Sequence, residues 1–330
     1  GLNILLMLEP HVVLPGEFDE RIWKEFDHVF GPFDALIGQD NKFHKILFPR
    51  SESKKNPVTE LQSQRELLYP LSRRKNAICM ISGNKQSHVP SELYSKRIEV
   101  ADWFSKNSNI PFDVYGTPPF PLPNYRGLCP KPQKLSVMKQ YRYNLCFENT
   151  NHPVLSAGYI TEKILDCFET RTIPIYLGAS NIDKYVPEDC FIDFREFDSL
   201  GELDKFLQSM SQKEYELYIS AIDAWVTAGN RRKYSSHPFY DSLAELCASS
   251  SSKSLENLFA GDKTWTVEKA TPPTARDWKF RSVPVMWTWK HLMKAAPPVL
   301  ENGKISSGPR LDANTPGTDD VPTRDHRSPL

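Results

Sequence analysis

Short runs of apolar residues alternate along this chain with longer segments in which apolar residues recur every three or four positions. The runs are typical of buried strands, and the spaced segments are typical of helices that cover a sheet. Strands are predicted at residues 3–8, 33–38, 46–48, 77–82, 111–115, 144–147 and 172–178. Helices are predicted at residues 18–30, 91–106, from 161 onward, and as a pair within 198–228. Strands that alternate with helices predict an α/β protein with parallel sheets.

Changes of composition divide the chain into three parts. Residues 51–75 are rich in Ser, Lys and Arg and predict a linker, so a first domain spans residues 1–75 and a second spans residues 76–248. Residues 249–330 begin with a run of serines, become rich in proline, and hold few aliphatic residues after Leu300. Such a segment cannot bury enough apolar surface to offset its conformational entropy, so we expect a mostly disordered C-terminal tail.

One segment of the tail, residues 278–294, differs from its surroundings. It interleaves tryptophan and phenylalanine with lysine and arginine. Aromatic and basic side chains together suit a membrane interface, which predicts peripheral membrane contact through the tail. The alternative is that the aromatic side chains pack against the first domain.

The overall composition excludes several classes of protein. The chain has 41 basic and 41 acidic residues, so it lacks the positive surplus of a nucleic-acid-binding protein. It has no run of 18 apolar residues, so no transmembrane helix is predicted. Its six cysteines form no C-x-x-C pair, and a zinc site is therefore not expected. Three of them lie in apolar stretches and are predicted to be buried free thiols: Cys79, Cys146 and Cys167.

Residues 141–178 predict a single βαβ unit with a polar loop between its first strand and its helix. Ligands of such units bind beyond the carboxyl ends of the strands, near helix N-termini, which carry about half a positive charge. Asn149, Tyr159, Glu162 and Lys163 fall in this region, which therefore predicts a site for a phosphate-bearing ligand. The region contains neither a P-loop nor a G-x-G-x-x-G sequence. The alternative is an ordinary surface helix that begins with a solvated Glu–Lys pair.

Four strings in this part of the chain occur in a characteristic order. They are Phe147-Glu148-Asn149-Thr150, Tyr159 to Lys163, Pro174 to Gly178, and Phe191 to Phe197. Together they resemble the donor-binding signature of the α1,3/4-fucosyltransferases, the family-10 glycosyltransferases, and the resemblance extends over about residues 1–245. It implies an α/β fold with two facing Rossmann-like domains of the GT-B type. It also implies that the second domain binds GDP-β-L-fucose and that the first domain is N-terminally truncated.

The resemblance implies a direct displacement in which a carboxylate takes the proton of an acceptor hydroxyl. Glu9, at the end of the first predicted strand, is the candidate general base, and Glu17 and Glu20 are the next candidates. The alternative for Glu9 is an ordinary exposed carboxylate at a strand end. Arg97 and Lys163 would bind the diphosphate of the donor and neutralise its charge as it leaves.

The same resemblance suggests roles for the loop and for the start of the helix. Asn149 and Tyr159 would contact the phosphates or the fucose. Glu162 would bind ribose hydroxyls or stabilise the positive charge that develops on the sugar, which makes it the second catalytic candidate. His152 is interpreted as a bystander. The core of the chain holds no D-x-D motif, so we expect no metal ion and no cofactor other than the donor substrate.

The expected acceptor is a glycan, either of the N-acetyllactosamine type or a lipopolysaccharide chain, and no nucleic acid is expected as a partner. Two locations stay open: the cytoplasm, with possible membrane association, for a bacterial protein, and the luminal side of the Golgi membrane for a eukaryotic one. Two other functions also stay open. The chain could transfer another nucleotide sugar on the same scaffold, or it could be an inactive relative that binds GDP or a glycan.

Overall fold

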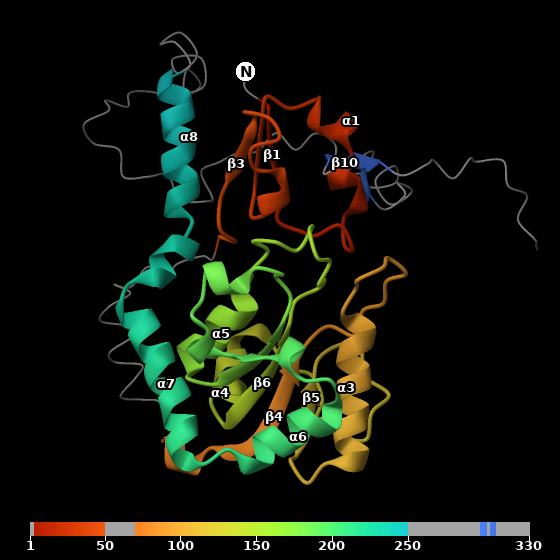
Figure 1. The fold of residues 1–330 in the computed structure, drawn as a ribbon, viewed down its shortest axis with the longest axis vertical. Coiled ribbons are helices and arrows are strands. Elements are labelled where there is room, and N and C mark those ends of the chain that lie inside the picture. Colours follow the sequence, from red (N-terminus) through yellow and green to blue (C-terminus); the bar gives the residue numbers. More distant parts are fainter. Residues whose placement is uncertain (1–2, 50–69, 250–297, 302–303, 308–330) are drawn as a thin grey trace, which may run out of the picture.

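The computed structural model describes residues 3–49, 70–249, 298–301 and 304–307, which form two α/β units that lie one above the other in Figure 1. We call residues 3–49 the first unit and residues 70–234 the second unit. Each has a parallel sheet of its own, so the predicted α/β class with two Rossmann-like units is confirmed.

The second unit has a five-stranded sheet of strand order β5-β4-β6-β7-β8, in which every pair is parallel. Its strands are β4 (Lys75–Ile81), β5 (Phe112–Tyr115), β6 (Tyr141–Phe147), β7 (Ile173–Leu177) and β8 (Ile192–Asp193). The chain moves outward from β4 to β5 and then returns past β4 to β6. The direction of winding therefore changes between β4 and β6, and ligands of doubly wound sheets bind at such a switch point.

Helices of the second unit cover its sheet (Figure 1). Several of them begin at residues whose side chains cap the first turn. They are α3 (Tyr94–Asn107), α4 (Lys134–Met138), α5 (Glu162–Thr170), α6 (Leu200–Ser209) and α7 (Gln212–Thr227). Thr161 and Ser199 are the caps of α5 and α6, and Ser211 forms a capping box with Glu214 at α7. Because a capped first turn satisfies backbone N–H groups, these starts are encoded locally. The predicted helices at 91–106, from 161 and within 198–228 are confirmed.

The first unit has a smaller parallel sheet of order β1-β2-β3. Its strands are β1 (Ile4–Leu6), β2 (His28–Gly31) and β3 (Phe43–Lys45). Short helices lie between them: η1 (Pro15–Phe18), α1 (Glu20–Trp23) and η2 (Asp34–Leu36).

Three predictions for the first unit are wrong. The helix expected at 18–30 ends at Trp23, because residues 28–31 pair with β1 and the Asp27 and His28 amides bond the Asn3 carbonyl. The strand expected at 33–38 is the single turn of η2. The strand expected at 46–48 lies earlier, at 43–45, where it pairs with β2. For the helix and for the strand at 43–45, pairing with a strand that is distant in sequence overrides the local pattern.

The chain returns to the first unit at α8 (His237–Ser249), the last helix of the described residues, which stands beside β3 in Figure 1. Phe239 packs edge-on against Phe30 of β2, with ring centroids 5.2 Å apart, and Ile46 completes this small core. The sequence pattern did not predict this contact between α8 and the first sheet.

The tail expected to be mostly disordered contains an antiparallel ribbon of β9 (Pro298–Glu301) and β10 (Lys304–Ser307), whereas disorder of the tail as a whole stays a prediction. The basic aromatic segment 278–294 lies outside the described residues.

Two predictions from composition can be compared with the described part of the chain. Cys79, Cys146 and Cys167 are buried free thiols, as predicted. None of the described helices is long and apolar enough to cross a membrane.

Candidate active site

A small pocket opens at the switch point between β4 and β6. Its walls come from the ends of these two strands and from helices α3, α4 and α5. The lining residues are Ile81, Ser82, Arg97, Lys134, Met138, Asn144, Leu145, Cys146, Phe147 and Lys163. Three of these side chains are cationic, so the pocket suits an anionic group.

The centre of the site is Glu148, the first residue after β6, whose side chain is fully buried. Its carboxylate accepts hydrogen bonds from the Thr161 backbone N–H at 2.8 Å and from Thr161 Oγ1 at 2.8 and 3.0 Å. Lys163 Nζ donates to it at 2.9 Å and retains a quarter of its side-chain exposure. A buried charge is tolerated only when it is paired and hydrogen-bonded. Glu148 thereby fixes both the first turn of α5 and the ammonium group of Lys163.

Close packing around Glu148 requires glycine at position 178. A Cβ atom there would lie 2.4 Å from Cγ of Glu148 and 2.8 Å from the hydroxyl of Tyr176. Because real Cβ contacts are longer, any side chain at position 178 would displace the buried carboxylate. The Pro174–Gly178 string is thus part of the same site.

Arg97 of α3 joins the site from the other side of the switch point. Its guanidinium is buried and donates to the carbonyl oxygens of Phe147 and Glu148 at 2.8 and 2.5 Å. It also donates to Oδ1 of Asn149 at 3.1 Å and to Oγ of Ser82 at 3.2 Å. Burial lowers the pKa of Arg97, although guanidinium groups stay protonated. Arg97 therefore ties the end of β6 together and brings a positive charge to the pocket wall.

Glu162, the first residue of α5, is half-buried beside Lys163. Burial alone would raise its pKa, but Lys163 and Lys134 outweigh that effect and lower it. Glu162 is therefore ionised at neutral pH. The side chain of Glu162 is only partly enclosed by the protein, whereas that of Glu148 is fully buried.

Tyr159 lies at the boundary between the two units and not on the pocket wall. Its ring is buried and stacks on Phe33 of the first unit, with centroids 5.5 Å apart and planes 10° apart. It belongs to the apolar cluster that contains Met7 and Phe18 of the first unit. Of the loop residues predicted to meet the donor, Asn149 lies beside Arg97, whereas Tyr159 packs the units together.

Glu9 reaches the site from the first unit. It is half-buried, and burial raises its pKa, while the charges of Lys163 and Lys85 lower it and those of Glu162 and Glu148 raise it. These mutual effects place Glu9 within electrostatic range of the start of α5. Glu9 and Glu162, the two carboxylates predicted to be catalytic, thus interact electrostatically although they belong to different units.

Glu17 is a candidate for the general base after Glu9, and it lies close to Glu9. Burial raises the pKa of Glu17 to about 8, and the charge of Glu9 acts in the same direction. Its Oε2 atom is buried and makes no hydrogen bond to any described residue. Glu17 is therefore mostly protonated at neutral pH, whereas a general base must be ionised. Glu20 lies in α1.

His152 contacts the first unit. Its ring meets that of the buried His11 edge-on at 5.3 Å, and its Nδ1 accepts from the backbone N–H groups of Val154 and Leu155. Burial, assisted by His152, lowers the pKa of His11 to about 4. The His11 ring is therefore neutral at pH 7, and burial lowers the pKa of His152 as well. No group of three or more potential metal ligands occurs within the described ranges.

Residues 71–260 match the model of a family described as glycosyltransferase family 10 (fucosyltransferase), C-terminal part. Among curated proteins, the chain is 27% identical over 216 residues to alpha-(1,3)-fucosyltransferase FucT of Helicobacter pylori, a match that covers 60% of this chain and 44% of that protein. It is 33% identical over 119 residues to 3-galactosyl-N-acetylglucosaminide 4-alpha-L-fucosyltransferase FUT3 of Homo sapiens, which covers 35% of this chain and 30% of that protein. The chain thus spans less than half the length of these relatives.

Two solved structures can be superposed on this chain. One is an alpha1,3-fucosyltransferase with GDP-fucose, at 19% identity and a TM-score of 0.45, covering 66% of this chain and 65% of that one. The other is an alpha-glucosyltransferase in complex with UDP-glucose and DNA containing an abasic site, at 10% identity and a TM-score of 0.49. That match covers 74% of this chain and 71% of the other.

Proposed function

The chain belongs to glycosyltransferase family 10, and from that premise we propose that it transfers L-fucose from GDP-β-L-fucose to a hydroxyl group of a glycan. The product would carry an α1,3 or α1,4 linkage. The observation that carries the proposal is the fixed arrangement of Glu148, Thr161 and Lys163 at the switch point of the second sheet. It holds an ammonium group at a helix N-terminus, where a diphosphate is most favourably bound.

The donor would lie across the pocket at the start of α5. Lys163 and the backbone N–H groups of the first turn face the diphosphate, and Arg97 adds positive charge from the opposite wall. Glu162 is ionised and free to accept hydrogen bonds from ribose hydroxyls. As the bond between the sugar and the β-phosphate breaks, negative charge builds on the leaving GDP, and these cations stabilise it.

The acceptor would enter from the side of the first unit. Its hydroxyl oxygen attacks the anomeric carbon of fucose on the face opposite the phosphate, so that the configuration inverts. The hydroxyl proton passes to the carboxylate of Glu9, which belongs to the first unit. Burial raises the pKa of Glu9, which makes it a stronger base than an exposed glutamate.

We further propose that turnover needs no metal ion, since Lys163 and Arg97 supply the positive charge that a divalent cation would otherwise bring. The acceptor would be a glycan of the N-acetyllactosamine type or a lipopolysaccharide chain. We place the protein in the cytoplasm of a bacterium or, for a eukaryotic source, on the luminal side of the Golgi membrane.

The donor assignment is tested by thermal protection and by calorimetry. GDP should raise the melting temperature well above the value measured with UDP. Lys163→Ala removes one charge-assisted contact, worth about 1.5–3 kcal/mol, and should weaken GDP binding roughly tenfold to a hundredfold. Lys184→Ala, which removes an exposed lysine of the same unit, is the matched control and should bind GDP normally. Equal protection by GDP and UDP would refute the assignment.

The activity is tested with a panel of nucleotide sugars and glycan acceptors, with products detected by mass spectrometry. Glu9→Gln keeps the size of the side chain but cannot take the proton, and should slow transfer by about 10²–10⁴-fold without loss of GDP binding. Transfer from a donor other than GDP-fucose would favour the other-sugar alternative. GDP binding without any turnover would favour the inactive relative.

A further inference from the structure

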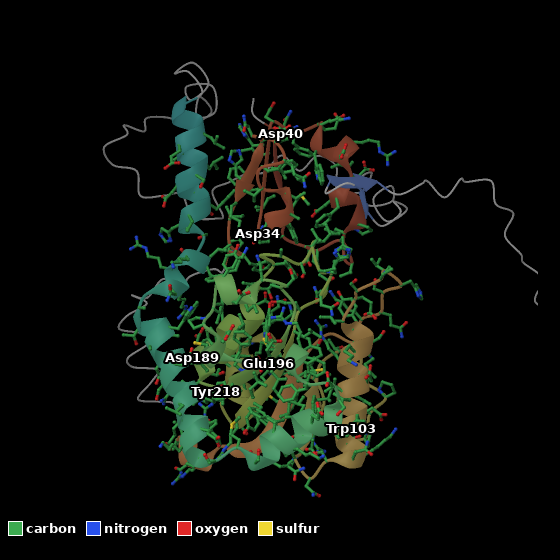
Figure 2. The ribbon with its side chains drawn as sticks, viewed as in Figure 1. Asp34, Asp40, Trp103, Asp189, Glu196 and Tyr218 are labelled. Atoms are coloured by element: carbon green, nitrogen blue, oxygen red, sulfur yellow. The ribbon has the colours of Figure 1, made fainter. Side chains whose placement is uncertain are left out.

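Asp34, in η2 of the first unit, accepts hydrogen bonds from side chains of both units. Lys45 Nζ donates to Oδ1 at 2.6 Å, and Nδ2 of Asn181 donates to Oδ2 at 2.8 Å. The hydroxyl of Tyr185 lies 2.8 Å from both oxygens. Asn181 and Tyr185 belong to the segment that follows β7 in the second unit. Figure 2 shows Asp34 at the boundary where the two units meet.

The backbone around Asp34 also bonds to the second unit. The Asp34 N–H donates to the carbonyl of Ala157 at 2.9 Å. The Gly158 N–H donates to Oδ1 of Asn181 at 2.8 Å. The side-chain amide of Asn181 therefore bonds both to Asp34 and to the loop that contains Gly158. Lys45 lies 4.9 Å from the centre of the Tyr185 ring, which adds a cation–π contact.

Position 158 leaves no room for a side chain. Gly158 has φ of +77°, and a Cβ atom there would lie 2.3 Å from both Nζ of Lys45 and the carbonyl oxygen of Pro32. Immediately after it, Tyr159 stacks on Phe33. Residues 32–34 of the first unit therefore pack closely against residues 157–159 of the second.

The loop at residues 157–159 leads directly into the proposed donor site. Thr161, which caps α5, follows Gly158 by three positions, and Lys163 follows by five. On the other side, Asp34 follows β2, which pairs with β1, and β1 leads to Glu9. The contacts of Asp34 thus connect the strand that carries the proposed base with the helix that carries the proposed cation.

We propose that Asp34 is a positioning residue that holds the two units at a fixed separation, and with it the segment that carries Glu9 relative to the helix that carries Lys163. The arrangement of the two units is then set before the substrates arrive. Lys45, Asn181 and Tyr185 are the partners through which Asp34 acts. This inference rests on the proposed fucosyl transfer, because the transfer is what gives the separation its consequence.

The inference predicts a change in turnover without a change in donor binding. Asp34→Asn keeps the size of the side chain, but an amide offers one acceptor oxygen and a donating NH₂ group, so at least one partner loses its acceptor. Displacement of reacting groups by about 1 Å can cost about a hundredfold in rate. We therefore expect transfer to N-acetyllactosamine to fall about tenfold to a hundredfold in kcat. The Kd for GDP should stay within about twofold, because its ligands lie in the second unit.

Asp40→Asn is the matched control. Asp40 is an exposed aspartate of the same unit that accepts from the Lys42 N–H, and Figure 2 places it at the end of the unit remote from the boundary. This variant should turn over normally. Tyr185→Phe removes a single hydrogen bond to Asp34 and gives a milder variant, which is suitable if Asp34→Asn does not fold. Its kcat should fall without a change in GDP affinity.

Hydrogen exchange of residues 157–163 supplies a readout that does not depend on activity. Exchange should accelerate in Asp34→Asn and stay as in the wild type in Asp40→Asn. Normal kcat in both Asp34→Asn and Tyr185→Phe would overturn the inference, and so would a parallel loss of GDP affinity. If the wild type itself does not transfer fucose, the proposed function fails, whereas unchanged exchange at 157–163 would refute the positioning contact alone.

Discussion

The hydroxyl of Thr161 makes the sharpest test of how the site is held together. Its Oγ1 is buried, donates to the carboxylate of Glu148, and accepts from the backbone N–H of Lys163 as the N-cap of α5. Loss of an N-cap costs about 0.5–2 kcal/mol. Loss of a hydrogen bond to a charged group costs about 1.5–3 kcal/mol. The Thr161 N–H and Lys163 still bond to Glu148 after substitution. We therefore expect loss of the hydroxyl to lower the free energy of unfolding by about 2–4 kcal/mol.

Two substitutions separate the hydroxyl from its volume. Thr161→Val removes the hydroxyl but fills the same space, and should lower the free energy of unfolding by the full amount. Thr161→Ser keeps the hydroxyl and should stay within about 1 kcal/mol of the wild type. Urea unfolding followed by tryptophan fluorescence gives both values, and calorimetry with GDP shows whether Lys163 has shifted. If valine and serine at this position were equally stable, the contact with Glu148 would not carry the stability assigned to it.

Three further outcomes are expected. Burial raises the pKa of Glu17 to about 8, above its value near 4.5 in the unfolded chain. The stability that protonated Glu17 contributes is therefore present at pH 4 and is lost as the pH rises toward 8. Between pH 5 and pH 8, Glu17→Gln should lose less unfolding free energy than the wild type. Phe239→Ala should destabilise the contact between α8 and the first sheet by about 2–4 kcal/mol, measured by urea unfolding, with Leu217→Ala on the exposed face of α7 as the neutral control. Transfer of fucose should persist in excess EDTA, and an activity that is lost and then restored by Mn²⁺ would contradict the proposed use of Lys163 and Arg97.

The second unit could be predicted from the sequence because its signals are local. The apolar strands at 77–82 and 144–147 and the cap at Thr161 need no information about distant partners. The first unit could not be predicted in the same way. Its strand at 28–31 follows a segment with helical spacing, and only pairing with β1 decides where the helix ends.

Within the site, the sequence identified the charged residues but not their partners. In the sequence Glu148 is only part of a recognition string, whereas in the structure it is a buried charge that Lys163 neutralises. The resemblance places Tyr159 at the donor. Its stacking on Phe33 depends on how the two units meet, which no local pattern records.

The charge of Lys163 links donor binding to the pKa of Glu9, the proposed base. In the free protein, Lys163 lowers the pKa of Glu9. A diphosphate bound beside Lys163 would neutralise that charge, so the pKa of Glu9 should rise, and the carboxylate should become a better proton acceptor only once the donor is present. Because Glu9 must be ionised to act, the acid limb of kcat, which reports the complex, should lie at higher pH than the acid limb of kcat/KM, which reports the free enzyme. Acid limbs at the same pH in both profiles would mean that Lys163 and Glu9 do not sense one another during turnover.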